Sequence, residues 1–487
     1  MCQVPSCIAK VMIAHNWKWQ IGLAAALLTI AVTVCASTTQ AQEVTRDDAV
    51  PERPKIIPNR RWEEDWSVLA DPRVKREPLD RLKYIPLSRR HPKTYLSLGF
   101  NLRERFEVDH SPLFGTVSGL KGEWLLSRLE VHADLRLGKH VQVFAQLQSA
   151  FAPGKKVLAP VDQDRLDLEQ CFIRLTERLG GGTVTLRMGR QLMDFDLQRF
   201  VSSREGPNLR QAFDAVYLDY RRDAWRITGA YTHPVRTRDL RSFDDYSSHH
   251  QTFSGLLFRR RLWQTSQLSV GYSRYTRDAA AFISVSGNER RANIDVRFTG
   301  TINGFDWDLE AMNQTGRIGA YAIKAWGFGT LIGHTFTETR WTPHLGLGVD
   351  AASGNRNANG HTLNTFNPLF PNGYYLADFT GYPNLIHIKP AITVHPTHAV
   401  NLMVALALQG RESIADAVYT FPSFPIANTA GRPGRYTGTY GELRADWKIT
   451  PHYSAALEAV HYAIGKPIRQ AGGRYGNYLG IEFRWAW

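Results

Sequence analysis

Arginine is the side chain whose chemistry stands out in this sequence. The chain has 59 lysine and arginine residues against 45 acidic ones, a formal charge of +14, and arginine greatly outnumbers lysine. A guanidinium group is a planar fork that binds carboxylates and phosphates through paired hydrogen bonds, whereas an ammonium group is a point charge. Arginines arranged along one surface would therefore suit a ligand that carries many anionic groups.

The stretch from residue 183 to residue 220 shows how these arginines are arranged. Two segments in which apolar and polar residues alternate flank a charged loop, 189–214, and a period of two is typical of a strand. We expect the loop to fold into a channel, because Pro207 fixes a bend and Gly206 permits an unusual backbone dihedral. The residues predicted to project into that channel are Arg190, Arg204 and Arg210, with Glu205 or Asp214 orienting them.

The same alternation recurs from residue 95 to the end of the chain. Between Arg128 and Arg136, five polar side chains alternate with apolar ones, and four of the five are charged. A charged face of this kind cannot point into a dry core, so it lines a wet channel or meets bulk water. The arginines predicted to lie on such inner faces are Arg103, Arg105, Arg128, Arg136, Arg187, Arg297, Arg444 and Arg484, and Glu130 and Asp134 are predicted to orient them.

The connections between the alternating segments are short and long in turn. This order predicts an antiparallel up-and-down barrel of about 18 strands, with 16 as the alternative, which is typical of the bacterial outer membrane. No segment after residue 41 has the ~18 uninterrupted apolar residues that a membrane helix needs. A barrel this wide holds water or a plug, because its side chains cannot fill it.

Three parts of the chain are expected to differ in role. Residues 1–41 resemble a cleaved secretory signal, with lysines before an apolar run at 21–34, and an uncleaved anchor is the alternative. Residues 42–93 are expected to be a periplasmic lead-in, although the segment 61–66 could form a helical turn or contact the lumen. Residues 94–487 are expected to form the barrel. Three of the four cysteines lie in the signal, so no disulfide can form within one mature chain.

Several motifs from about Arg61 onward resemble the alginate-export family of outer-membrane proteins. They are RWEEDWSVLADP, LKYIPL, YLSLGFNLRERFE, LEVHADLRLG, PVDQDRLDLEQCF, LRMGRQ and SREGPNLRQAFDAV. The resemblance implies a monomeric barrel of about 18 strands, with an arginine-rich lumen that passes a polyuronate out of the cell.

Residues that could support catalysis or bind a metal are few. Asp162, Asp164, Asp167 and Glu169 include spacings that could hold a metal, but acids at a loop end mostly serve solvation and turns. Adjacent His249 and His250 would point apart in an extended loop, and no nucleophile triad is visible. Gly180–Gly182 precede a strand and predict a turn, not a phosphate loop. We therefore expect no catalytic residue, no metal and no cofactor.

These observations favour an outer-membrane channel for export or diffusion of an anionic polysaccharide, such as alginate or another polyuronate. One alternative is a porin for small organic anions, and a second is an outer-membrane barrel enzyme. An adhesin is less consistent with charged inner faces. The expected partners are outer-membrane lipid, the polysaccharide and periplasmic export machinery. We expect a monomer that does not bind nucleic acid.

Overall fold

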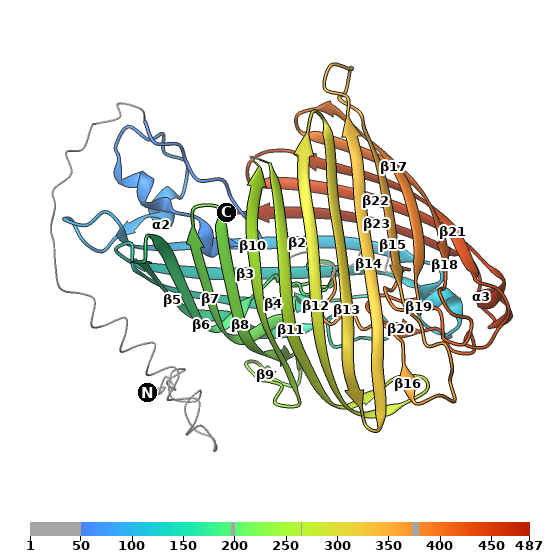
Figure 1. The fold of residues 1–487 in the computed structure, drawn as a ribbon. Coiled ribbons are helices and arrows are strands. Elements are labelled where there is room, and N and C mark those ends of the chain that lie inside the picture. The colour runs from blue at the N-terminus through green and yellow to red at the C-terminus, as the bar shows by residue number, and fades with distance from the viewer. Residues whose placement is uncertain (1–49, 196–199, 264, 373–378) are drawn as a thin grey trace. The chain divides into compact units, whose positions relative to one another are not determined.

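The alternation of apolar and polar residues produces a closed antiparallel sheet within residues 51–487 (Figure 1). The computed structural model describes residues 50–195, 200–263, 265–372 and 379–487, so the predicted signal lies outside the described residues. Within the described part of the chain, 18 strands form the barrel, as the connections predict. In chain order they are β2 (Thr94–Asp109), β3 (Gly122–Leu137), β4 (Val141–Phe151), β5 (Asp164–Leu179), β6 (Gly182–Leu192), β7 (Ala212–Arg222), β8 (Trp225–Arg236), β10 (Gln251–Trp263), β11 (Ser266–Ala281), β12 (Ser286–Ile302), β13 (Phe305–Ile318), β14 (Tyr321–Thr335), β15 (His344–Ala352), β17 (Ile386–Thr397), β18 (Val400–Gly410), β21 (Tyr436–Lys448), β22 (Tyr453–Ile464) and β23 (Gly476–Ala486).

The barrel closes where the first long strand, β2, pairs with the last, β23. Closure leaves no exposed strand edge that could pair with another chain. The remaining elements are short: β1 (Ile85–Pro86), β9 (Tyr246–Ser247), β16 (Thr362–Leu363), the pair β19 (Tyr419–Thr420) and β20 (Phe424–Pro425), the helices α2 (Asp80–Lys83) and α3 (Lys466–Gln470), and the 3-10 turns Arg61–Glu63, Trp66–Ala70 and Pro112–Gly115. In the described residues we find no helix with the length and apolar character needed to cross a membrane.

Short turns and long loops lie at opposite ends of the strands. Gly180 and Gly181 form the turn between β5 and β6, and both have a positive φ, 57° and 78°. Two successive residues of this kind form the tight hairpin turn whose twist matches that of the strands. The predicted turn at Gly180–Gly182 is thereby confirmed.

Two local features depart from the regular pattern of the barrel. Alternation is weak in β5 because its pairing with β4 shifts register twice, between Gln146 and Leu147 and between Gln148 and Ala150. Each shift moves later residues to the opposite face of the sheet. The connection between β13 and β14 falls where a long loop is expected but is a tight hairpin, since β13 continues to Ile318 and β14 starts at Tyr321.

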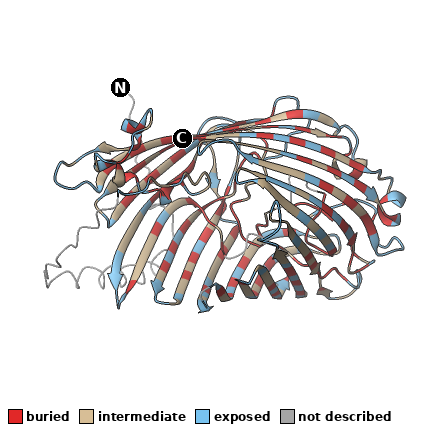
Figure 2. Cartoon of the chain, turned by 90° about the horizontal axis from the view of Figure 1, so that it is seen from above, coloured by how far each residue is buried: buried red, intermediate tan, exposed pale blue. Residues whose placement is uncertain are grey.

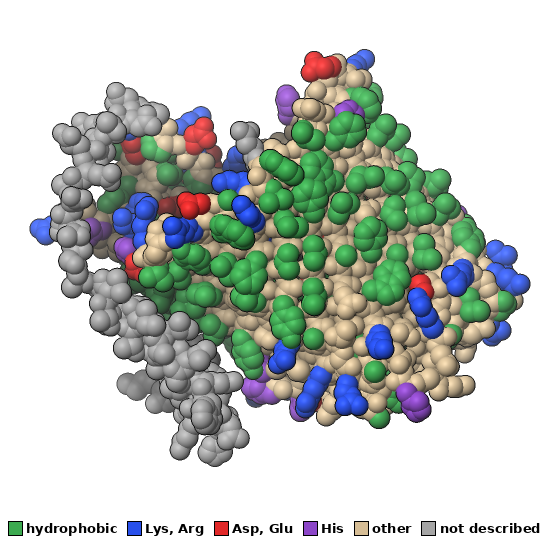
Figure 3. All heavy atoms as spheres, in the orientation of Figure 1, with side chains coloured by type: hydrophobic (Ala, Val, Ile, Leu, Met, Phe, Trp, Pro, Cys, Tyr) green, Lys and Arg blue, Asp and Glu red, His purple; other side chains and the backbone are tan. Residues whose placement is uncertain are grey.

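The outer faces of the strands are apolar. Val131, for example, is 49 % exposed, and Figure 3 shows hydrophobic side chains spread over the outward faces of the strands on the visible side. Along each strand, exposed residues alternate with buried ones (Figure 2). The buried set is largely polar, and includes Arg103, Arg128 and Glu130. Polar inner-wall residues are buried in so wide a barrel because other parts of the chain cover them.

Three long loops and the segment before β2 supply that cover. We call residues 193–195 and 200–211, between β6 and β7, the third loop. Its Val201 pairs with Phe370 of the loop after β15, and both pack on inward-facing Phe213 and Phe253. The loop after β18 packs Val418 and Ile426 against inward-facing Tyr440 and Tyr462. The N-terminal segment, residues 51–93, packs Trp62 on Phe144 and Phe172 of the wall.

A charge on the outer face should destabilise the barrel in a way that depends on depth. Val131 lies midway along β3, opposite Phe100 and Leu147. Val131→Arg is expected to lower the free energy of unfolding by roughly 2–4 kcal/mol, because the guanidinium would enter hydrocarbon. Leu137→Arg, at the end of the same strand and 46 % exposed, should cost only about 0–1 kcal/mol. Urea unfolding in lipid vesicles, followed by tryptophan fluorescence, would measure both; equal costs would show that the faces are wrongly assigned.

Candidate functional site

Three arginines form a row across neighbouring strands of the inner wall. In the register of the sheet, Arg103 of β2 lies directly opposite Arg128 of β3 on one side and Arg484 of β23 on the other. Arg103 and Arg128 are buried, and Arg484 is partly buried. Like charges in directly opposed positions destabilise a sheet unless another group compensates them. Wall acids compensate part of this charge, since Glu130 lies 3.1 Å from Arg128 and Glu482 lies 2.5 Å from Arg484. The remaining acceptors come from outside the wall.

The third loop supplies acceptors from its main chain. Arg103 donates to the carbonyl oxygens of Glu205 at 2.7 Å and Pro207 at 2.8 Å. Arg105 donates to the carbonyl of Gly206 at 2.6 Å. Three consecutive carbonyls thus point at two guanidinium groups, and the loop is held inside the barrel by its backbone.

The Glu205 carboxylate lies among the arginines and compensates their charge. It accepts hydrogen bonds from Arg128 at 2.5 Å and Arg484 at 3.1 Å, and Arg103 lies 4.0 Å from it. Burial by itself would raise the pKa of Glu205, but the charges of Arg128, Arg210 and Arg484 hold that pKa well below its usual range. Glu205 is therefore ionised at neutral pH and takes the position of an anionic ligand.

Arg210 ties the other end of the loop to the wall. Its guanidinium donates two hydrogen bonds of 2.8 Å to the Glu169 carboxylate and lies 2.6 Å from Glu130 and 3.5 Å from Glu205. Such a two-pronged pair is the strong form of an arginine–carboxylate contact. The sequence suggested Glu169 only as a possible metal ligand. Because Glu169 lies in an irregular strand, two residues from Asp167, the sequence pattern did not show that its side chain points inward.

The backbone of the loop differs from the prediction at one residue. The unusual dihedral belongs to Arg204, with φ of 56°, and not to Gly206. Asn208, which sequence reasoning missed, donates to the carbonyls of Ser127 at 3.2 Å, Phe151 at 3.0 Å and Asp162 at 2.8 Å. A buried amide that bridges two wall carbonyls and one carbonyl of the connection between β4 and β5 fixes the height of the loop in the barrel.

The N-terminal segment occupies the lumen near the short turns. The ring of Trp62 packs on Phe144 and Phe172, each with a centroid separation of 5.9 Å, and the guanidinium of Arg187 lies 5.4 Å from the Trp62 ring. Arg136 donates to the carbonyls of Trp62 at 3.0 Å and Glu64 at 2.7 Å. Residues 61–63 and 66–70 form 3-10 turns. Both alternatives for this segment, the turn and the lumen contact, are therefore present.

A basic hollow lies beside this segment. It is a cavity of about 140 Å³, and its lining includes Lys93, Arg136, Lys139 and Arg174. Asp65, the acid in the lining, accepts hydrogen bonds from the amide of Ser67 and the hydroxyl of Tyr95, each at 3.0 Å. Nearby Asp134 accepts from Arg136 at 3.0 Å and from Gln142 at 2.8 Å. The hollow thus presents several cations close to the end of the barrel that carries the short turns.

A chain of contacts joins the N-terminal segment to the third loop. Arg61 donates to the Asn101 side chain at 3.0 Å, and Asn101 donates to Glu130 at 3.0 Å. Glu130 in turn pairs with Arg128 at 3.1 Å and with Arg210 of the loop at 2.6 Å. The N-terminal segment and the third loop thus meet at one wall carboxylate.

The remaining predicted residues lie apart from this cluster. Arg190 belongs to β6, alternates with inward Arg187 and Gln191, and pairs with Asp214 at 3.0 Å, so neither Arg190 nor Asp214 joins the cluster. The side chain of Arg204 lies over the ring of Phe370 at 5.8 Å. Two further arginines pair with acids elsewhere on the wall: Arg297 with Asp308 at 2.7 Å, and Arg444 with Asp446 at 2.9 Å and Glu458 at 3.0 Å. The role of every predicted residue in a substrate path stays a prediction.

Comparison with known proteins agrees with this architecture. The sequence matches the family described as "Alginate export" over residues 94–482. Similar solved structures are OccAB3 of Acinetobacter baumannii (TM-score 0.55, 10 % identity, covering 80 % of this chain and 99 % of that one) and a BenF-like porin of Pseudomonas fluorescens Pf-5 (TM-score 0.54, 9 % identity, 80 % and 99 %). OccD3 (OpdP) of Pseudomonas aeruginosa is also similar (TM-score 0.54, 11 % identity, 80 % and 91 %).

No curated protein matches the sequence significantly. At such low identities, the structural likeness shows the fold, which is that of outer-membrane porins. The family match covers most of the barrel, from the first residue of β2 into β23. The chain belongs to the alginate-export family and is an outer-membrane β-barrel channel.

Proposed function

We propose that this channel carries an anionic polysaccharide, a polyuronate such as alginate, through a lumen lined by arginines. The observation that supports the proposal most is the convergence of Arg103, Arg128 and Arg484 on the Glu205 carboxylate. A uronate residue carries the same functional group as the Glu205 side chain. A wall that binds one carboxylate in this way has the donors to bind the carboxylates of a passing polymer.

In this mechanism, the third loop and the polymer compete for the same arginines. The loop satisfies the arginines when no polymer is present, and uronate carboxylates replace Glu205 as the chain advances. Neighbouring acids such as Glu482, 2.5 Å from Arg484, limit how tightly any one position holds the polymer. Weak binding at many positions permits movement along a channel.

The basic hollow beside Arg136 is the proposed entrance. Its cations lie where a polymer arriving from the periplasm would first meet the barrel, next to the N-terminal segment. We infer that the protein acts as a monomer and that periplasmic export machinery delivers the polymer. The N-terminal segment then has to move before the chain can pass.

A porin for small organic anions is the second candidate. It is favoured by the extent to which loops and the N-terminal segment fill the lumen, since a small anion needs less displacement than a polymer. The two candidates differ in how block of the channel depends on ligand length. A polymer channel binds longer oligouronates more tightly because more residues engage arginines at once, whereas a small-anion porin gains nothing beyond the first sugars.

Single-channel recording in planar bilayers would test the proposal. The pore is expected to prefer anions in a salt gradient, and oligouronates should block its current with an affinity that rises with length. Arg128→Glu with Arg136→Glu should shift the reversal potential toward cations and weaken the block, because two cations of the path become anions. Arg340→Glu, on the turn after β14, reverses one charge outside the lumen and serves as the control for each single reversal. A cation-selective wild-type pore, or block by neutral oligosaccharides as strong as by uronates, would overturn the proposal.

A further inference from the structure

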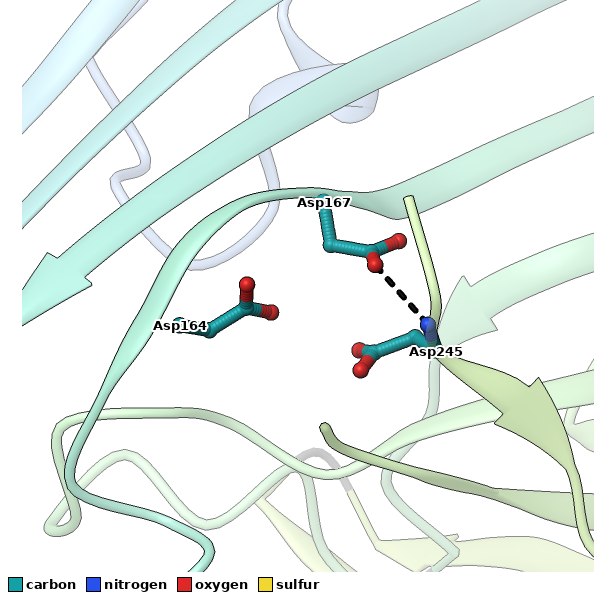
Figure 4. A group of neighbouring side chains, drawn as sticks. All are labelled: Asp164, Asp167 and Asp245. Atoms are coloured by element: carbon teal, nitrogen blue, oxygen red, sulfur yellow. Dashed lines mark hydrogen bonds between the residues drawn. The ribbon is translucent and has the colours of Figure 1, made fainter. Parts of the chain in front are cut away.

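Three carboxylates from two distant parts of the chain meet at the long-loop end of the barrel. Figure 4 shows them. Asp164 and Asp167 belong to β5, and Asp245 belongs to the loop of residues 237–250, which follows β8 and includes β9. One oxygen from each carboxylate can be chosen so that all three lie within 4.8 Å of one another. Figure 4 shows the three side chains turned toward a shared space.

Asp164 is the member that the protein leaves uncompensated. Its side chain is 0 % exposed, and neither of its carboxylate oxygens has a hydrogen-bond partner among the described residues. The amide of Leu166 interacts with it, but not with the geometry of a full hydrogen bond. Burying an ionised carboxylate without a partner is unfavourable, so this side chain is suited to a ligand that the protein itself does not supply.

The nearby arginines do not balance the group. Arg190 lies 3.7 Å from Asp167 but donates to Asp214 at 3.0 Å, and Arg165 is paired with Asp239 at 3.0 Å. Asp167 accepts hydrogen bonds from the amides of Asp245 at 2.9 Å and Leu168 at 2.6 Å, which orient its carboxylate without neutralising it. Negative charge is therefore in excess where the three side chains meet.

We propose that Asp164, Asp167 and Asp245 bind one calcium ion, which fastens the loop of residues 237–250 to β5. Calcium prefers carboxylate and water oxygens at about 2.3–2.6 Å and tolerates irregular geometry. Two oxygens on opposite sides of such an ion lie about 4.8 Å apart, and the three carboxylate oxygens lie within that distance of one another. Water would supply the remaining ligands at Asp245, which is only partly buried.

This proposal departs from the expectation that the chain has no metal site. The sequence places Asp164 and Asp167 near each other, but Asp245 is separated from Asp167 by 78 residues and joins them only through the fold. The site is separate from the arginine cluster: among the described residues, its three carboxylates pair with none of Arg103, Arg128, Arg210 and Arg484. Its ligands come from a strand end and a loop, so binding would order the rim of the barrel and leave the lumen as it is.

The test uses the mature protein in detergent after removal of divalent ions with a chelator. Adding calcium chloride is expected to raise the unfolding temperature by a few degrees and to slow tryptic cleavage at Arg238 and Arg241 in the loop. The double variant Asp164→Asn, Asp245→Asn should fold, since it loses repulsion, and should show neither effect. Asp278→Asn, an exposed rim acid paired with His250, should respond as the wild type does.

Direct calcium binding, measured by titration calorimetry, completes the experiment. One bound ion in the wild type and in Asp278→Asn, lost in the double variant, supports the site. Equal binding by the double variant would mean that the ion binds elsewhere, for example to copurified lipid, and would overturn the assignment. So would an absence of binding to the wild type, or an equal response to magnesium, because magnesium demands near-ideal octahedral geometry and dehydrates reluctantly, so a buried carboxylate cluster suits it poorly.

Discussion

Replacing Glu205 with lysine is expected to release the third loop from the barrel wall. The new ammonium group would lie among Arg103, Arg128 and Arg484, which now bind the Glu205 carboxylate. Removing one partner of a buried ion pair costs roughly 3–5 kcal/mol, and reversing its charge adds repulsion. The arginines would then face the lumen, so single-channel conductance, anion preference and the affinity for oligouronates should all rise.

Two further variants make this experiment interpretable. Glu205→Gln keeps the shape of the side chain and leaves the carbonyl contacts to Arg103 and Arg105 in place, so its effect should have the same sign but be smaller. Glu338→Lys changes charge by the same amount on the turn after β14 and should leave conductance unchanged. Heat-modifiable migration on gels would verify that each barrel is folded. If Glu205→Lys conducts like the wild type, the loop does not control the pore.

The lowered pKa of Glu205 also predicts how the loop responds to acid. A carboxylate with a lowered folded-state pKa stabilises the fold above its unfolded-state pKa of about 4.3 and loses that contribution only as pH falls below it. Conductance should therefore change little between about pH 7 and pH 5, because Glu205 stays ionised across that interval.

The second large effect is expected from Trp62→Ala in the N-terminal segment. The variant removes the ring that packs on Phe144, Phe172 and Arg187, a loss of roughly 3–5 kcal/mol for a buried aromatic side chain. The lost contacts attach the segment to the wall, whereas the hydrogen bonds between strands are unchanged. The barrel should therefore remain folded while the segment detaches. Conductance should rise, and trypsin should cut near Arg60. Trp341→Ala, an exposed ring on the turn after β14, is the matched control.

Combining Trp62→Ala with Glu205→Lys gives the most discriminating result. The N-terminal segment and the third loop obstruct the same lumen one after the other, so they act as resistances in series. Opening one leaves the other to limit the current, and the double variant should exceed the sum of the two single gains. Simple addition would indicate two separate paths through the barrel.

The sequence was sufficient to predict the barrel because contact with lipid requires an apolar residue at every second position of a strand. Apolar residues such as Val131 must face outward, and their neighbours Glu130 and His132 then face inward by the geometry of the pleat. The same logic places Arg103, Arg128 and Arg484 on the inner wall. The order of short and long connections gives the strand number, since each connection joins two antiparallel neighbours.

Features that depend on exact position were harder to predict. Arg187 and Arg190 are three residues apart, and in a strand an odd separation puts them on opposite faces, so assigning Arg190 to the loop misplaced it. The partners of Arg103 and Arg105 are main-chain carbonyls, which every residue possesses and no sequence pattern reveals. Glu169 lies in a strand whose bulges shift its face. These contacts follow from tertiary packing alone.

The contact of both Asn101 and Arg210 with Glu130 has a consequence for energetic coupling between the two ends of the pore. Arg61 reaches Glu130 through Asn101, so a change in the segment or in the loop alters the carboxylate that holds the other. By thermodynamic linkage, this coupling is reciprocal: the free energy by which loss of the segment changes attachment of the loop equals the free energy by which loss of the loop changes attachment of the segment. A ligand that displaces the segment would thereby change the work needed to displace the loop, so the two obstructions of the lumen are not energetically independent.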